Sequence, residues 1–213
     1  MSRLLFALLF LFAATLSAAD LVKNGKAVSV IVIGENPTKS AQLAAYELQY
    51  HIAKKTGVTL PIAAKAEKGK LPICVGGMNG FKSQEYLVDI KPGKIILAGC
   101  DAQESGKVNY ADEKSFPSRW KECATLYAAY DFLEMAGFRW YIPTDIGTTF
   151  TPSKNLSIAE KRSAGHLLTV TAIILISILQ IRSGLIPTIG TTGIFSISGK
   201  RNFTVSVSVS AEN

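Results

Sequence analysis

Two carboxylic acids, Asp131 and Glu134, are the first residues whose type and spacing could do chemistry. Three positions apart, they would lie within one turn of a helix. Sugar hydrolysis uses such a pair, with the carboxyl groups roughly 5–10 Å apart across the bond that is cleaved. Both acids, however, face away from the apolar stripe that the same segment presents. We therefore expect a solvated helix face, and the sequence predicts no catalytic residue in this chain.

The sequence also contains no pattern that is typical of a metal or cofactor site. The two histidines, His51 and His166, are not spaced with cysteines or acids as metal ligands are. We expect His51 at the surface or on the flank of a helix. The glycine-rich stretch GGMNG, residues 76–80, lacks the Lys-Ser/Thr pair of a phosphate-binding loop and is typical of a turn after a strand. The sequence predicts no metal site and no cofactor.

An aromatic cluster follows the second predicted helix. Phe138 and Trp140 alternate with Arg139 and Tyr141, and Pro143 follows. A short strand would point one pair toward the core and the other outward, and the proline would end its pairing. Two interpretations stay open: core packing, or a contact of Trp140 or Tyr141 with a carbohydrate or a neighbouring domain.

The elements that would position these residues can be read from apolar periodicity. Residues 27–35 are rich in β-branched side chains and predict a strand. Asn36-Pro37-Thr38 then has the composition of a helix start, and Gly57 that of a helix end. Between them the apolar residues recur at helical spacing. These residues are Ala41, Ala44, Ala45, Leu48 and Ile52.

The second half of the domain begins with a strand at residues 71–77 and a hairpin at residues 85–99, whose turn is formed by Lys91-Pro92-Gly93-Lys94. Residues 101–123 are polar and predict a long loop. A second helix carries its apolar stripe on Leu126, Ala129, Tyr130 and Leu133 and ends at Gly137. The order β-α-β-β-β-α-β predicts an α+β fold, in which a small antiparallel or mixed sheet carries two helices on one face.

Four segments together resemble a known family. These are AAYELQYHIAKKTGVTLPI, ICVGG, EYLVDIKPGKIILAG and TLYAAYDFLEMAGFRWYIPTDIG. In their order they resemble the amino-terminal domain of bacterial alpha-glucuronidase-like and beta-hexosaminidase-like glycoside hydrolases, over about residues 27–158. The resemblance implies a non-catalytic domain that packs beside a catalytic (β/α) barrel. The polar loop before Ala124 is longer than in many relatives.

Composition adds a cellular context. The net charge is +7, but no basic stripe alternates with aromatic residues, so we expect no nucleic-acid partner. Residues 1–19 have the pattern of a signal peptide, with the cut before Asp20. We therefore expect an exported protein, periplasmic or extracellular, whose domain spans residues 20–158. The pattern leaves open whether Cys74, Cys100 and Cys123 are buried thiols or include one disulfide.

The remaining residues, 159–213, form an atypical hydrophobic tail. No acid occurs between Arg162 and Ala211, and the apolar run at residues 167–181 is short for a membrane span. Residues 203–209 alternate like a strand that has no obvious partner in the domain. The residues after Glu160 are too few for a barrel, which takes about 250. We expect a frameshift or a broken gene near Arg162 and a chain truncated before its catalytic barrel.

Three functions are therefore compared. The first is a non-catalytic accessory domain of an exported carbohydrate-active protein, with a catalytic barrel as its partner and polysaccharide as a further one. The second is a stand-alone exported binding protein anchored to a membrane by residues 167–181. The third is an enzyme of another type that uses Arg119 and Trp120 in the long loop.

Overall fold

The computed structural model describes residues 18–118, 120–141, 147–166, 195–197 and 203–205. The chain divides into two compact units. The first consists of Met1–Gly137 with Thr151–Gly165, and the second of Phe138–Phe150 with His166–Asn213. Each unit is described by itself.

A six-stranded sheet forms the centre of the first unit. Its order is β11-β6-β7-β5-β3-β4. The strands are β3 (Ser29–Val32), β4 (Ile62–Ala63), β5 (Leu71–Val75), β6 (Glu85–Lys91), β7 (Lys94–Gly99) and β11 (Lys161–His166). Strands β4, β3, β5 and β7 run parallel to one another, whereas β6 is antiparallel to β7. The sheet is therefore mixed, and the carboxyl ends of four of its strands lie at one edge.

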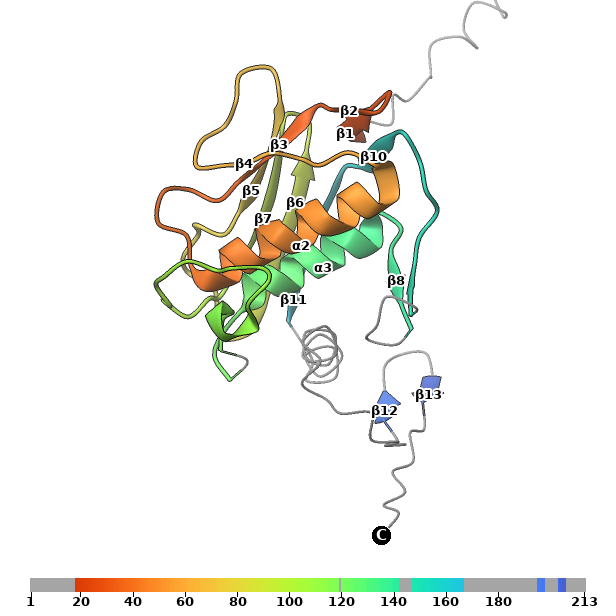
Figure 1. Ribbon diagram of the computed structural model, residues 1–213. Helices are drawn as coiled ribbons and strands as arrows, with labels where there is room; N and C mark the ends of the chain where they lie inside the picture. Colours follow the sequence, from red (N-terminus) through yellow and green to blue (C-terminus); the bar gives the residue numbers. More distant parts are fainter. Residues whose placement is uncertain (1–17, 119, 142–146, 167–194, 198–202, 206–213) are drawn as a thin grey trace, which may run out of the picture. The chain divides into compact units, whose positions relative to one another are not determined.

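Two helices cover one face of this sheet (Figure 1). Helix α2 (Lys39–Thr56) begins after Thr38, whose side chain accepts a hydrogen bond from the amide of Ala41, and ends at Gly57 in the left-handed conformation. Helix α3 (Ala124–Met135) packs against α2 and lies on β6 and β7. The predicted α+β fold is confirmed, as are both ends of the first helix.

The helices differ in how much of their surface is buried. All five apolar positions predicted for the first helix are buried. Helix α3 was expected to bury only one stripe, but residues 124–130 are all buried, as are Phe132 and Leu133. The reason is that α3 contacts the sheet with one face and the neighbouring helix α2 with another, so a second face is also removed from water.

The predicted hairpin is confirmed by the register of β6 and β7, in which Tyr86 pairs with Gly99 and Lys91 pairs with Lys94.

A separate three-stranded sheet has the order β10-β1-β2. It contains β1 (Ala18–Lys23), β2 (Lys26–Ala27) and β10 (Leu156–Ala159). Strand β1 thus begins two residues before Asp20, and Ala19 is buried opposite Ile158.

The second unit contains short antiparallel pairs. Strand β8 (Arg139–Trp140) pairs with β9 (Thr148–Thr149), so the aromatic segment forms its own hairpin and is not a strand of the main sheet. Strand β12 (Phe195–Ile197) pairs with β13 (Phe203–Val205). Strand β13 therefore pairs within the tail and is not a strand of the six-stranded sheet, in agreement with the expectation that it has no partner in the domain.

The described sheet also extends past residue 158, the predicted end of the domain. Strand β11 lies at its edge beside β6 and contains Arg162, near which we expected a break in the gene. The run 167–181 lies outside the described residues. Among those that the structure describes, no helix is long and apolar enough to cross a membrane.

The three cysteines are free thiols in the structure, with Cys123 buried and the other two half-buried. Burial raises the pKa of Cys123 to about 11, against the opposing effect of its hydrogen bond with Tyr127.

We expect Ellman's reagent to titrate three thiols per chain in denaturant, and Cys123 to react slowest in the native protein because it is protonated and covered. A Cys123→Ser variant should lose only the slow phase. A count of one thiol in denaturant would instead indicate a disulfide.

Candidate functional site

The candidate site lies at the carboxyl ends of the parallel strands. The segments that follow β3, β5 and β7 line a cavity of about 330 Å³, and residues 33–38 also line a second cavity of about 650 Å³. Sheets that contain parallel strands bind ligands most often at this edge, because the loops and the helix N-termini meet there. Every wall of both cavities belongs to the first unit.

Asp101 joins the two helices at this edge. Its carboxylate accepts a hydrogen bond from the Thr38 hydroxyl at 3.0 Å and another from the Thr125 amide at 2.9 Å. Thr38 caps α2, and Thr125 lies in the first turn of α3. The side chain thus supplies a negative charge to the amino ends of both helices, where backbone N–H groups and helix dipoles favour it.

Burial raises the pKa of Asp101 above its ordinary value, and the hydrogen bonds from Thr125 and Thr38 offset only part of that effect. An acid whose pKa is higher in the folded protein stabilises the fold below its unfolded pKa and loses this contribution as the pH rises through the folded pKa. We expect the stability of Asp101→Asn relative to the unmodified protein to rise as the pH increases from about 4. Urea denaturation of both proteins at a series of pH values measures this, and a constant difference would contradict it.

A second polar cluster is buried where α2 meets α3 and the loop that precedes α3. Glu47 is fully buried and accepts hydrogen bonds from the hydroxyls of Tyr110 at 2.7 Å and Tyr130 at 3.0 Å. His51 lies one turn further along α2, with Nδ1 at 2.9 Å from the Glu47 carbonyl oxygen and 3.4 Å from Oε2. Since Nδ1 faces a carbonyl acceptor, it carries the proton.

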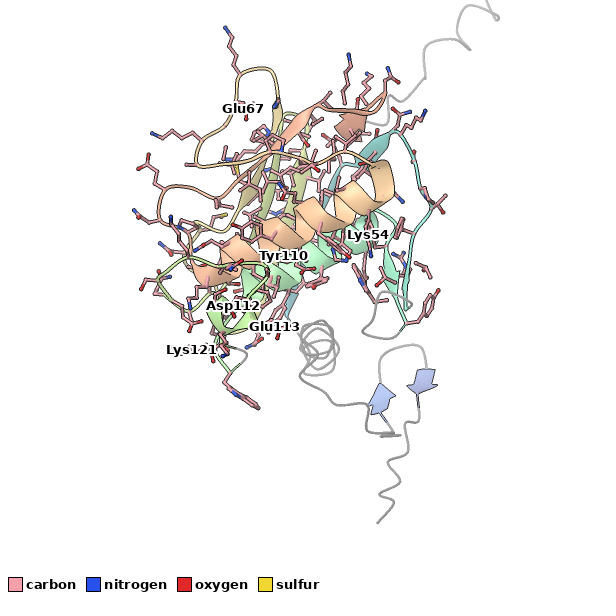
Figure 2. All side chains as sticks on the ribbon, in the orientation of Figure 1. Lys54, Glu67, Tyr110, Asp112, Glu113 and Lys121 are labelled. Atoms are coloured by element: carbon pink, nitrogen blue, oxygen red, sulfur yellow. The ribbon has the colours of Figure 1, made fainter. Side chains whose placement is uncertain are left out.

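The position of His51 corrects the expectation of a surface or flank residue, because it is only 3% exposed. A buried polar side chain needs partners, and Glu47 and Tyr130 provide a carboxylate and a ring. Tyr110 reaches this cluster from the loop before α3 (Figure 2) and also contacts the rings of Tyr46 and Tyr50. The long polar loop is therefore fastened to α2 by an aromatic residue.

The two acids of α3 are also placed differently from a purely solvated pair. Asp131 is half-buried and accepts a hydrogen bond from the Ser163 hydroxyl of β11 at 3.1 Å, whereas Glu134 is exposed. Burial, then the charges of Asp131 and Glu134 and the hydrogen bond with Asp131, raise the pKa of Tyr86 to about 12. Asp131 thus links α3 to two strands at the edge of the sheet.

The structure distinguishes the two aromatic candidates of the second unit. Phe138 is buried, and the Trp140 ring stacks on it with centroids 6.1 Å apart. Tyr141 is 77% exposed, and its amide donates to the Gly147 carbonyl across the hairpin. The predicted alternation of inward and outward side chains is therefore present. Trp140 contributes to packing, and Tyr141 is the side chain that is accessible for a contact.

Asp101 and the Glu47 cluster were not predicted from the sequence. A lone aspartate at the start of a polar loop and a lone glutamate within a helix carry no motif. The one available sign for Glu47 was its position between the buried Ala44 and Leu48, on the apolar side of the helix. Among the described residues, no group of three or more His, Cys, Asp or Glu could hold a metal ion.

The sequence and the fold were compared with known protein families, curated proteins and solved structures. No protein-family model and no curated protein matches the chain. Among solved structures it is similar to the Flavobacterium johnsoniae chitobiase FjGH20, with 12% identity and a TM-score of 0.39. The match covers 71% of this chain, which spans 20% of the length of the chitobiase.

Proposed function

We propose that this chain is a non-catalytic accessory domain of an exported carbohydrate-active protein, with a catalytic barrel as its partner. The sequence resemblance supports the family relation. Its four segments correspond to α2 with β4, to β5, to the β6–β7 hairpin, and to α3 with β8. The pattern of residues 1–19 supports export.

One observation carries the non-catalytic part of the proposal, namely that three partly or fully buried carboxylates hold elements of the fold together. Asp101 joins α2 to α3, Glu47 binds two tyrosines, and Asp131 binds Ser163. Hydrolysis of a glycoside requires two carboxyl groups that face a substrate and exchange protons with it. Carboxylates that serve as structural acceptors do not fulfil that role.

The exposed ring of Tyr141 is the contact that we assign to the partner. Exposed aromatic side chains at domain edges supply apolar area with little loss of side-chain entropy, which suits both a protein interface and a sugar ring. Since the main chain of Tyr141 is fixed by the hairpin, the ring is presented from a defined backbone.

The locus that encodes this chain tests the proposal. We expect the neighbouring DNA to encode a (β/α) barrel with paired carboxylates, in this or another reading frame. If that barrel is produced with this chain, the two should co-purify. Tyr141→Ala should weaken the association by about tenfold, as truncation of an interface aromatic does. Lys94→Ala, at the start of β7, serves as a control and should have no effect. Absence of any such reading frame would remove the proposal.

A further inference from the structure

The cavity of about 330 Å³ at the strand ends is a feature that the accessory role does not explain. Its volume falls in the range of about 300–1,000 Å³ that is usual for small-molecule sites. Its walls are residues 33–38, 77–81 and 99–101, with Gln103. Each of the first three segments begins where a parallel strand ends, so rigid elements hold the walls from three sides.

The charges at this cavity disfavour an anion. The amino ends of α2 and α3 would attract one, but the Asp101 carboxylate already occupies the position between Thr38 and the Thr125 amide. Glu35 adds a second acid to the lining, paired with Lys65 at 2.8 Å. None of the described lining residues of this cavity is a lysine or an arginine. Because Lys65 balances Glu35, an anionic ligand would meet the Asp101 carboxylate without a cation of the lining to balance it.

The remaining side chains suit a neutral ring that carries hydroxyl groups. Asn36, Asn79 and Gln103 are exposed carboxamides, and each can both donate and accept hydrogen bonds, as pairs of hydroxyls require. Phe81 and Met78 add apolar surface to the same wall, with Met78 42% exposed. A few polar groups that converge beside apolar area are the usual composition of a ligand site.

We propose that this cavity binds a neutral saccharide unit in preference to an acidic one. The lining residues indicate a neutral ligand with a ring that carries hydroxyl groups. The choice of a saccharide among such ligands rests on the proposed function. Asn79 and Gln103 act as hydrogen-bonding residues, Phe81 contacts the C–H face of the ring, and Asp101 excludes uronic acids.

The test is a titration of the ¹⁵N-labelled full chain, followed by NMR, with N-acetylglucosamine, xylobiose and glucuronic acid as probes. We expect a neutral probe to shift the amides of Gly34, Gly77 and Gly80 in a saturable way, with a Kd on the order of 1 mM. Glucuronic acid at neutral pH should bind at least about tenfold more weakly, because its carboxylate would face the Asp101 carboxylate.

Two exposed substitutions localise the binding. Asn79→Ala and Gln103→Ala should each weaken it by about tenfold, as the loss of one hydrogen bond does. Lys94→Ala, at the opposite end of β7, should leave it unchanged. The proposal is overturned if no probe shifts these glycines, if the shifts centre on Tyr141, or if glucuronic acid binds as well as the neutral sugars. Cleavage of xylobiose in the same sample would refute the accessory function, whereas the shifts at the cavity would still report on the site.

Discussion

Replacing Glu47 with alanine should lower the free energy of unfolding by about 3–5 kcal/mol, because two hydroxyls lose their acceptor and each buried donor left unpaired costs about 1–3 kcal/mol. The two hydroxyls that Glu47 accepts from belong to Tyr110 and Tyr130. Without the carboxyl group they would have to find other acceptors, and His51 would lose its neighbouring carboxyl oxygen. Urea denaturation followed by circular dichroism measures the loss.

A graded series separates the cluster from general disruption of the helix. Tyr110→Phe removes one hydrogen bond and should cost about 1 kcal/mol. Glu47→Gln keeps an acceptor oxygen and should be less destabilising than alanine. Gln49→Ala lies on the same helix and removes one partly buried bond to the Leu60 carbonyl, so it is the matched control. A Glu47→Ala variant no less stable than Gln49→Ala would contradict the structural role of the cluster.

Replacing Gly99 with alanine should destabilise the fold by about 1–3 kcal/mol through overpacking. A Cβ at this position would lie 2.6 Å from both the backbone carbonyl carbon and the Cβ of Ala124, and 2.8 Å from the Thr125 amide nitrogen. The first turn of α3 would have to move away from β7. That movement would also lengthen the bond between the Thr125 amide and Asp101, which joins the helices.

Two variants make this result specific to the contact. Gly93→Ala has the less favourable backbone, with φ of +83°, but meets nothing within 4 Å, so it measures backbone strain without a clash. Ala124→Gly in the Gly99→Ala background removes one of the clashing atoms and should restore part of the stability. Thermal unfolding of the four proteins provides the comparison. If Gly99→Ala is less destabilising than Gly93→Ala, the close approach of α3 to β7 does not explain why a glycine is needed at position 99.

Local patterns explain which parts of this fold could be predicted. The capping residue Thr38, the glycine at position 57 and the turn at Lys91-Pro92-Gly93-Lys94 act within a few residues of the elements that they end or join. Apolar spacing then identified the buried face of α2. These signals are local, so they are present in the sequence before any tertiary contact is made.

The parts that were missed depend on distant contacts. Tyr110 and Tyr130 are 63 and 83 positions from Glu47, and the Thr38 hydroxyl is 63 positions from Asp101. Strand β11 has no alternating apolar pattern, and it joins the sheet through backbone pairing beside β6. Burial of His51 likewise follows from Glu47 and Tyr130, so helical periodicity alone placed it wrongly.

We propose that Glu47, Asp101 and Asp131 have structural roles and that this domain does not hydrolyse glycosides. The most direct test is an assay of the purified full chain on aryl-glycosides and on acidic oligosaccharides derived from xylan. We predict no turnover above buffer for this protein or for Asp131→Asn and Glu134→Gln variants. Turnover that either substitution abolishes, in a protein that keeps its circular dichroism spectrum, would contradict the account.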